Sequence, residues 1–485
     1  MSTHQESVTG AHAASRPRAV PKVATEVPGP ESLRWIERER QAETGGNAYP
    51  DFFGMGMHSP VFVGEEGSLL KDIDGNTYFE SSGCYSCGTF GYLPQELIEV
   101  AVENMRRMVH VPDMPTPQRI EAAEAILSIA PGSLQEGRVQ FELGGGGAMD
   151  LAYKLAFYHA ANTKPYSNHV TIAFGGNYHG RTVATLSLTG STHAQEGMPR
   201  IANNVVRFPF PYCYRCPFDK HREDCDLFCV AFVRHQFESD AYGLFNPHTG
   251  RCQASVMVWE PIQAHIGMVF PADEFFAEMR KVCDDYGLLL VDDEIAMGVG
   301  HTGEWFAAQT YGATPDVIAL AKALTGGVWP LGAVIASKEV SATWGATPDK
   351  HMGSYHGNPV GCAVAARNIA LLKERDVLAN VRAQAAYANE RLADLFAHHP
   401  LVGEGKAVGL VIGMELVKDR DTKQPAPDDT LMLAKECMKR GLLVLRLGYF
   451  GNRLNLMPSL DSSRAEMEFI FDILDESLTV TKRLG

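Results

Sequence analysis

The order of apolar and polar positions changes twice along the chain. Residues 61–80, "VFVGEEGSLLKDIDGNTYFE", alternate between apolar and polar side chains around an Asp-Gly pair, which predicts a small sheet with tight turns. From about residue 96 to residue 337, short apolar runs such as "HVTIAF", "SVMVWEP" and "LLLVDDE" alternate with helical stretches. This alternation is typical of a parallel sheet that carries helices on both faces.

The last third of the chain returns to a mixed pattern. The segments "PVGCAVAARNIALLKE" and "QAAYANERLADLFAHH" have helical spacing, and strand-like segments follow in "VGLVIGMELV" and "LLVLRLG". We therefore predict an α/β fold with a large central, mostly parallel sheet domain and a smaller α+β domain built from both chain ends. The predicted parts are a flexible tail rich in Ser, Ala, Pro and Thr (1–30), the N-terminal part of the small domain (31–95), the large domain (96–340) and the C-terminal part of the small domain (341–485).

Charge and composition exclude several classes of protein. The 485 residues include 43 Lys and Arg against 58 Asp and Glu, a formal net charge of −15, which argues against nucleic acid as the main partner. No apolar run approaches the ~18 residues of a membrane span, and the N-terminus has no apolar stretch typical of a secretory signal. We therefore expect a cytoplasmic protein, in a reducing compartment that disfavours disulfides.

A run of four glycines, Gly144 to Gly147, precedes a helical pattern in "FELGGGGAMDLAYKLAFYHA". Glycines that open a helix expose backbone N–H groups at the positive end of the helix dipole, which is a favourable place for a phosphate. The run lacks the Gly-Lys-Ser/Thr of a nucleotide-binding P-loop and does not form a clean dinucleotide fingerprint. A flexible loop is the alternative.

Acidic and aromatic residues follow two of the apolar runs. Asp292, Asp293 and Glu294 end "LLLVDDE", where the carboxyl end of a parallel strand meets the ligand-binding edge of an α/β sheet. Such carboxylates suit a divalent metal or a cationic ligand, and a solvated loop is the alternative. Tyr178 follows another run in "FGGNYHGRT", where an aromatic ring can stack on a flat ligand or simply pack against its neighbours.

A lysine with apolar neighbours, Lys322, lies just before a glycine-rich turn in "PDVIALAKALTGGVWPLGAV". Apolar surroundings disfavour the charged amine, and the neutral amine is the nucleophile that forms an imine. A lysine that extends to solvent from a helix end is the alternative. Each of these stretches is a weak signal alone. Together, a phosphate cradle, a stacking aromatic ring, a carboxylate and a lysine match what pyridoxal phosphate requires.

The chain resembles the class III aminotransferases, which have the aspartate-aminotransferase-type fold of pyridoxal-phosphate enzymes, fold type I. The resemblance covers roughly residues 50–478. It rests on "GNYHGRTVATLSLTG", "WEPIQ", "DDEIAMGVGHTGEWFA", "PDVIALAKALTGG" and "HGNPVGCAVA". It implies a homodimeric transaminase that uses pyridoxal phosphate, with an amine donor and a 2-oxo acid acceptor as its small-molecule partners.

The resemblance also implies roles in the cofactor site. Lys322 would bind the aldehyde carbon of the cofactor and move the proton during the reaction. Asp293 would pair with the pyridine nitrogen. Gly145 and Gly146 would hold the phosphate, and Tyr178 would stack on the ring.

Two further positions concern the phosphate site. The family's usual Ser-Gly-Ser/Ala-Glu-Ala reads "GGGGA" here, so Gly147 replaces the glutamate and backbone N–H groups must do more of the binding. Ser354 in "SYHGNP" stands where the family usually has a threonine that completes the phosphate site of the partner chain, and it keeps the hydroxyl. The resemblance therefore implies an active site completed across a dimer interface.

The substrate pocket departs from the family pattern at two positions together. Asn455 in "LNLMPSL" replaces an arginine that often grips the α-carboxylate, and His265 in "EPIQAH" replaces the glutamate that covers this arginine. Losing both is consistent, because either charge buried alone is costly. The usual gate for glutamate and 2-oxoglutarate is then absent, unless another cation such as Arg453 or Arg446 replaces it.

We therefore predict an aminotransferase that moves an amino group from a primary amine or ω-amino compound to a 2-oxo acid by a ping-pong mechanism. Tyr85 in "SSGCYSCG" and Glu260 in "WEPIQ" are predicted to line the substrate pocket. The alternatives are a racemase or aminomutase of the same fold, and a regulatory protein that binds a cofactor or cluster without catalysis. The intact Lys322 and Asp293 argue against the last of these.

Four cysteines lie close together in "PYCYRCPFDKHREDCDLFC", within a predicted insertion at residues 207–232. The insertion follows the "RTVATLSLTG" segment, which we expect to be a strand. The C-x2-C-x8-C-x3-C spacing suits an iron–sulfur cluster or zinc, and free thiols are the remaining alternative. The "CYRCPF" stretch resembles the cysteine pair by which animal 4-aminobutyrate aminotransferases hold an iron–sulfur cluster. We predict a structural iron–sulfur cluster, with zinc as the alternative, ligated by Cys213, Cys216, Cys225 and Cys229.

Overall fold

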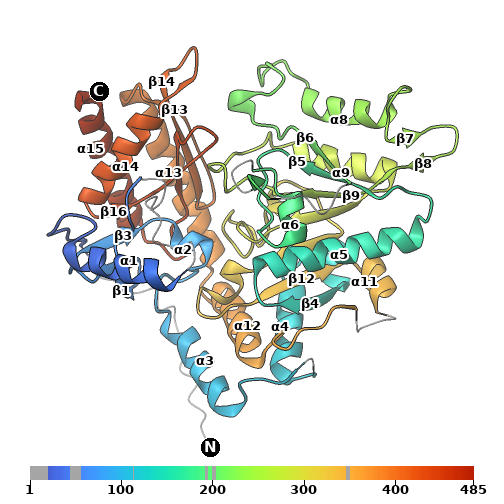
Figure 1. Ribbon diagram of the computed structural model, residues 1–485, viewed down its shortest axis with the longest axis horizontal. Coiled ribbons are helices and arrows are strands. Elements are labelled where there is room, and N and C mark those ends of the chain that lie inside the picture. Colours follow the sequence, from blue (N-terminus) through green and yellow to red (C-terminus); the bar gives the residue numbers. More distant parts are fainter. Residues whose placement is uncertain are drawn as a thin grey trace, which may run out of the picture.

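The computed structural model describes residues 20–43, 56–112, 114–191, 195–198, 204–345 and 350–484. Figure 1 shows a large sheet with its helices in the middle of the sequence, and a second group in which the first (blue) and last (red) elements lie side by side. The predicted α/β fold, with a mostly parallel main sheet and a smaller part built from both chain ends, is confirmed.

Seven strands form the large sheet in the order β4-β12-β11-β10-β9-β5-β6. The strands β11, β10, β9, β5 and β6 run parallel, whereas β12 pairs antiparallel with both β11 and β4. Every residue of β9, β11 and β12 is buried, as the continuous apolar runs lead one to expect for a sheet covered on both faces. The strands are β4 (Arg138–Glu142), β5 (Val170–Phe174), β6 (Val205–Phe208), β9 (Ala254–Trp259), β10 (Leu289–Asp293), β11 (Val317–Leu320) and β12 (Gly332–Ala336).

Helix α5 covers one face of this sheet, where its apolar residues share a buried cluster with Val317 and Ala319. The alternate residues Ile318 and Leu320 belong to the core on the other face. The helices of this part are α3 (Gln95–Arg107), α4 (Pro117–Leu127), α5 (Gly145–Thr163), α6 (Val183–Leu188), α8 (Phe228–Glu238), α9 (Phe275–Tyr286), α10 (Ala307–Thr310) and α11 (Lys338–Trp344). It also contains the 3₁₀ turns η2 (Gly132–Glu136), η3 (Cys213–Arg215) and η4 (Lys322–Thr325), and a hairpin of β7 (Phe245–Asn246) and β8 (Arg251–Cys252).

One local prediction is wrong. The "RTVATLSLTG" segment forms helix α6 and not a strand. Thr182 stands at the N-cap of this helix, and its side chain accepts a hydrogen bond from the Thr185 N–H at 3.4 Å. This capping favours a helical start, and it outweighs the preference of valine and threonine for strands.

The smaller part joins both ends of the chain. Its first sheet has the order β1-β2-β3-β16, with β3 and β16 parallel and Leu442 opposite Phe79. Lys22, in the described part of the predicted tail, exchanges backbone hydrogen bonds of 3.0 and 2.8 Å with Thr77. A second sheet has the order β13-β14-β18-β17, with β15 beside β14. The elements are α1 (Pro30–Ala42), β1 (Phe62–Glu66), β2 (Leu69–Asp72), β3 (Thr77–Glu80), α2 (Gly83–Ser86), α13 (Val377–His398), β13 (Val402–Val408), β14 (Val411–Asp419), β15 (Gln424–Pro425), α14 (Pro427–Lys439), β16 (Leu442–Leu443), β17 (Leu445–Leu447), β18 (Arg453–Leu456) and α15 (Arg464–Leu484). Helix α12 (Pro359–Glu374) packs against α3 and α4 of the large part.

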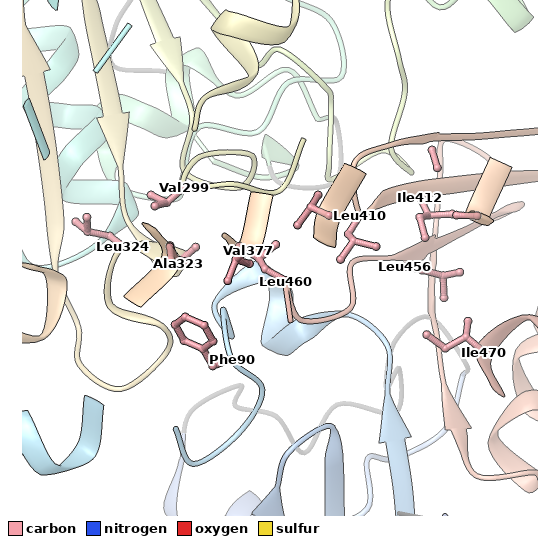
Figure 2. Close-up of a cluster of buried hydrophobic side chains, with 14 of the residues drawn as sticks. Phe90, Val299, Ala323, Leu324, Val377, Leu410, Ile412, Leu456, Leu460 and Ile470 are labelled. Atoms are coloured by element: carbon pink, nitrogen blue, oxygen red, sulfur yellow. The ribbon is translucent and has the colours of Figure 1, made fainter. Parts of the chain in front are cut away.

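The two parts share one hydrophobic core. Figure 2 shows Val299, Ala323 and Leu324 of the large part in the same cluster as Leu410 and Leu460 of the smaller part. Because this apolar surface is removed from water on both sides, the core holds the two parts against each other. In the part of the chain that the structure describes, no helix is long and apolar enough to cross a membrane.

Candidate active site

A cavity of about 560 Å³ is lined by residues of both parts of the molecule. One side is formed by the ends of β10 and β11, the loop after β5 and the start of α5, and the other by α2, β17 and β18. The structure therefore brings together most of the site residues predicted from the sequence. Those on the cavity wall are Tyr85, Gly145, Gly146, Tyr178, Glu260, His265, Asp293, Lys322 and Asn455.

The start of α5 forms an open cradle. Gly144 is extended and the helix begins at Gly145, so the N–H groups of the first turn have no partner within the helix. A Cβ at Gly144 would meet nothing within 4 Å, and a Cβ at Gly146 would only touch Thr182 at 3.2 Å. Open space beside the positive end of a 19-residue helix suits a phosphate group.

Gly147, which replaces the usual glutamate, lies against another carboxylate. A Cβ at this position would be 2.5 Å from Glu142 Oε2. Glu142 is 7% exposed, and its carboxylate accepts the Leu143 N–H at 2.9 Å and lies 2.6 Å from His351 Nε2. Burial raises the pKa of Glu142, but these hydrogen bonds outweigh it and leave the pKa lowered. The carboxylate beside the first turn of α5 is thus supplied by Glu142.

The three acidic residues after β10 have different surroundings. Asp293 lines the cavity, and its Oδ2 lies 2.8 Å from His179 Nδ1. Asp292 points to the other face of the strand and accepts a hydrogen bond of 2.8 Å from Trp259 Nε1. Burial raises the pKa of Asp292 well above its usual value and that of Glu294 to about 8. Of these three carboxylates, Asp293 is the one available to a ligand.

A chain of buried side chains holds Asp293 in place. Gln263 Nε2 donates to the Gly175 carbonyl at 2.9 Å and to Asn177 Oδ1. This fixes the Asn177 amide, whose Nδ2 then donates to His179 Nε2 at 3.0 Å. His179 therefore carries its proton on Nδ1 and donates it to Asp293. The sequence showed His179 only as a member of a motif, and the fold reveals it as the partner of Asp293.

Tyr178 is held from two directions. Its N–H donates to Glu260 Oε1 at 2.7 Å, and its ring centroid lies 4.7 Å from that of His265. Burial, and then the nearby Asp293 carboxylate, raise the pKa of Glu260 well above its usual value. A protonated Glu260 can fix the Tyr178 loop without placing a second negative charge beside Asp293.

Lys322 lies where β11 ends and η4 begins. Its φ is +41°, a left-handed backbone conformation that is unusual for lysine and is often found at functional sites. The side chain is half-buried and lines the cavity. Among the described residues, Lys322 Nζ forms no hydrogen bond or ion pair, which leaves the amine available to a ligand.

Asn455 on β18 forms an uncharged part of the wall. It is 1% exposed, and its Nδ2 donates to the Ala264 carbonyl at 3.1 Å. Because a carbonyl only accepts, this bond fixes the orientation of the amide. Asn455 Oδ1 is buried without a hydrogen-bond partner in the described structure.

Neither of the two arginines considered as substitutes for the missing cation lines the cavity. The Arg453 guanidinium is buried and donates to Glu415 Oε2 at 2.6 Å and to the Met268 carbonyl at 3.0 Å. Arg446 donates to the backbone carbonyl of Pro427 at 3.3 Å. The positions of Arg446 and Arg453 therefore do not support either residue as the substitute for the missing cation.

Tyr85 reaches the cavity from a left-handed turn. Cys84, Tyr85 and Ser86 have φ values of 55°, 54° and 66°, a conformation that costs about 1–2 kcal/mol per residue. The Glu80 carboxylate accepts the N–H groups of Ser82 at 2.7 Å and Cys84 at 2.9 Å. These charge-assisted hydrogen bonds offset part of the cost and keep Tyr85 at the cavity wall.

Ser354 is separate from this cavity. It lies exposed in the loop before α12 and is absent from the cavity wall of its own chain. Its predicted role, at the phosphate site of a second chain, stays a prediction.

The four clustered cysteines surround one small space of about 20 Å³ between η3 and the start of α8. None of them forms a disulfide, and burial raises the pKa of Cys229 to about 12. No three of the four described sulfurs lie within 4.8 Å of one another. A single zinc ion would hold its thiolates about 3.8 Å apart, so this arrangement is wider than a zinc site. The residues around the space are Cys213, Cys216, Cys225 and Cys229.

Comparisons with known proteins agree with this geometry. The family model for "Aminotransferase class-III" matches residues 56–478. A leucine/methionine racemase of Thermococcus litoralis is 30% identical over 445 residues, which cover 91% of this chain and 96% of the relative. A putrescine–pyruvate aminotransferase of Pseudomonas aeruginosa is 31% identical over 397 residues, which cover 80% and 84%. The crystal structure of an (S)-enantioselective ω-transaminase from Thermomicrobium roseum has a TM-score of 0.80 at 28% identity, and the match covers 93% of this chain and 98% of that one.

Proposed function

The chain belongs to the class-III aminotransferases, and we propose that it moves the amino group of a primary amine or ω-amino compound to a small 2-oxo acid. The predicted activity, transamination with pyridoxal phosphate, is confirmed by the family match and by the similar ω-transaminase structure. The choice of donor rests on one observation, the uncharged wall at Asn455, which holds no arginine to grip an α-carboxylate.

The cavity fits pyridoxal phosphate. The unpaired N–H groups at the start of α5 would bind the phosphate, and the absence of side chains at the glycines leaves room for it. Asp293, oriented by His179, would accept a hydrogen bond from the protonated pyridine nitrogen and keep it protonated, and Tyr178 would cover the ring. When bound, the cofactor withdraws electrons from the carbon atom that carries the transferred amino group.

Lys322 would perform the proton transfers. In the resting enzyme its amine would hold the cofactor through the aldehyde carbon, until the donor amine displaces it. The released Nζ would take the proton from the amine-bearing carbon of the donor and hold it for return within the same half-reaction. Hydrolysis would release the carbonyl product, and the 2-oxo acid would take up the amino group in a second half-reaction, which is a ping-pong sequence.

The cavity wall also suggests how the two substrates differ. Leu445, Leu447 and Met457 surround Asn455 with apolar surface, which favours donors without a carboxylate at this place. Arg181, whose guanidinium carbon lies 5.9 Å from the centre of the Tyr178 ring, is the arginine on the wall. It would bind the carboxylate of the 2-oxo acid and that of the amino acid formed from it. A panel of amines tested with pyruvate and with 2-oxoglutarate should give the highest rates for carboxylate-free amines with pyruvate. The similarity to a putrescine–pyruvate aminotransferase supports this expectation.

Replacing Asn455 with arginine should restore part of the missing carboxylate site. We expect Asn455→Arg to raise kcat/KM for α-carboxylate donors about tenfold, since a charge-assisted hydrogen bond contributes roughly 1.5 kcal/mol. The variant should lose stability, because His265 offers no fixed negative charge to the buried guanidinium. Asn455→Leu, which adds no charge, is the control and should not gain activity with glutamate. If glutamate is already the best donor of the unmodified enzyme, the proposed donor class is wrong.

Racemisation is the second candidate function. The observation in its favour is the similarity to a leucine/methionine racemase over nearly the whole chain. The two activities begin with the same proton removal by the lysine, and they differ in where the proton is returned. A racemase needs no 2-oxo acid, so steady-state turnover of one enantiomer without an acceptor would favour this alternative.

A homodimer is the proposed assembly. Ser354 lies exposed, away from the cavity of its own chain, and its hydroxyl suits a phosphate held by a second copy. Sedimentation of the holoenzyme should give twice the mass of the 485-residue chain. A monomer with full activity would exclude a site shared between chains.

For the four cysteines we propose a structural iron–sulfur cluster. All of them face one small space, and their spacing is wider than a single zinc ion requires. The adjoining polar segment "DKHREDCD" has little apolar surface of its own, so ligation would hold it in place. None of the ten cysteines forms a disulfide, which fits a reducing cytoplasm, the proposed location.

Cys213→Ser tests the cluster. Anaerobically purified protein should contain iron and sulfide in near-stoichiometric amounts. The variant should lose both and melt about 5 °C lower, because metal binding contributes to folding. Cys252→Ser, at a half-buried cysteine outside the group, should change neither value. Fully stable and active protein that contains neither iron nor zinc would end the proposal.

A further inference from the structure

A carboxylate and two imidazoles converge beside the phosphate cradle. Glu142 Oε1 lies 2.6 Å from His351 Nε2 and 3.2 Å from His356 Nε2. The two rings stack with centroids 5.2 Å apart and planes inclined by 19°. All three side chains are largely buried, with exposed fractions of 9%, 16% and 13%. Among the described His, Cys, Asp and Glu residues, no other set of three or more has all its possible ligand atoms within 4.8 Å of one another.

The spacing of these atoms matches a metal centre. Zinc binds histidine nitrogen and carboxylate oxygen at about 2.0–2.2 Å, which places neighbouring ligand atoms about 3.0–3.5 Å apart. Of the two measured separations, 3.2 Å falls within this range and 2.6 Å lies below it, at hydrogen-bond length. Both imidazoles direct Nε2 toward the same carboxylate oxygen, so shifts of a few tenths of an ångström would admit an ion among the three atoms.

The backbone around the two histidines is already fixed. The His351 carbonyl accepts a hydrogen bond of 3.3 Å from Gln140 Nε2, and the His356 carbonyl accepts one of 3.1 Å from Arg119 Nη1. Both ends of the 351–356 loop are therefore tied to neighbouring elements before any ion binds. A site held in this way loses little entropy when it takes up a metal.

The position of Glu142 gives a reason for a cation here. Its Oε2 fills the space beside Gly147, which directly follows the two glycines that line the cavity. A carboxylate so close to a phosphate site repels the phosphate, and a cation bound to Glu142 would offset this repulsion. Position 147 is a glycine in this chain, and the carboxylate beside the cradle comes from Glu142.

We propose that Glu142, His351 and His356 bind a divalent metal ion, zinc by the nature of the donor set, with water in the remaining position. The ion would offset the charge of Glu142 beside the phosphate cradle. It would also hold the loop that carries Ser354 against the end of β4. The site is distinct from the cysteine group, which lies between η3 and α8.

The test compares zinc content in matched variants of the holoenzyme. The double variant His351→Gln/His356→Gln keeps N–H donors that can reach Glu142, but glutamine is a poor zinc ligand. His248→Gln, at an exposed histidine on the β7–β8 hairpin, is the control. After incubation with zinc and gel filtration, we expect the double variant to contain one zinc per chain less than the wild type and the control. Cys213→Ser should keep this equivalent, which separates it from metal bound by cysteines.

Chelation supplies a second readout. Removing zinc from the wild type should lower its melting temperature by about 3 °C and weaken pyridoxal phosphate binding several-fold. In the double variant, chelation should change neither of these two values. Equal zinc content in the wild type and the double variant would overturn the proposal. It would also be overturned if chelation changed neither the melting temperature nor the affinity for pyridoxal phosphate, because the two histidines would then bind no metal ion that affects the protein.

Discussion

Replacing Lys322 with alanine should lower amino transfer by about 10⁴-fold or more, the upper range of what a positioned acid–base group contributes. The reason is that one amine serves both as the attachment point of the cofactor and as the carrier of the proton. Lys322 is the lysine on the cavity wall, and its Nζ has no partner among the described residues. The visible absorption of the bound cofactor should disappear in Lys322→Ala. Borohydride treatment of the wild type should fix the cofactor to the peptide that contains Lys322.

The matched control is Lys338→Ala, at an exposed lysine that begins α11. It should keep both the visible absorption and the activity. An unchanged absorption spectrum in Lys322→Ala, or borohydride labelling at a different lysine, would contradict the assignment of the cofactor to this site.

Asp293→Asn should lower kcat by about 10²–10³-fold, the usual effect of removing one preorganised electrostatic group from an active site. The carboxylate is the negative charge that keeps the pyridine nitrogen protonated, and an amide cannot supply that charge. The variant should still fold, because an amide can remain close to His179 in the same buried position. Steady-state kinetics, together with a cofactor titration, separate the loss in kcat from any loss in affinity.

The neighbouring Asp292→Asn provides a stringent control. Asp292 has the same chemistry and adjoins Asp293, but it faces Trp259 on the other side of β10. An amide oxygen can still accept the Trp259 hydrogen bond, so Asp292→Asn should retain most of the activity. Equal losses in the two variants would mean that neither carboxylate has a specific role toward the cofactor.

Local patterns were sufficient to predict the large sheet and the order of the chemistry along it. The strands β5, β9 and β10 are short apolar runs bounded by turn residues, which is the usual sequence pattern of buried strands. The strand prediction for the α6 segment was wrong because it rested on the average strand preference of its valine and threonine residues. The helix depends on one side chain, Thr182, which caps its start.

The contacts that orient the site could not be predicted in the same way. The hydrogen bond from His179 to Asp293 joins residues 114 positions apart, and that between His351 and Glu142 joins residues 209 apart. The glycine at 147 was visible in the sequence as the loss of a glutamate. That Glu142 fills the vacated space depends on packing that only the folded chain defines.

The same limit applies to the substrate side of the cavity. The sequence shows directly that position 455 holds no arginine. The structure then shows that neither Arg446 nor Arg453 lines the cavity in its place. Arg453 belongs to a buried ion pair with Glu415, because the fold of β14 and β18 places the two side chains together. No periodicity of the sequence distinguishes such an arginine from one that faces a ligand.

A single-turnover experiment tests the central claim, that this enzyme transfers an amino group in two separable halves. The holoenzyme is mixed with a carboxylate-free primary amine and no 2-oxo acid, and the carbonyl product is counted per active site. Amino transfer predicts one equivalent of carbonyl product, conversion of the cofactor to its amino form, and then a stop that pyruvate relieves. No carbonyl product from any amine of the panel, together with continued inversion of an amino acid in the absence of any oxo acid, would contradict amino transfer and identify a racemase.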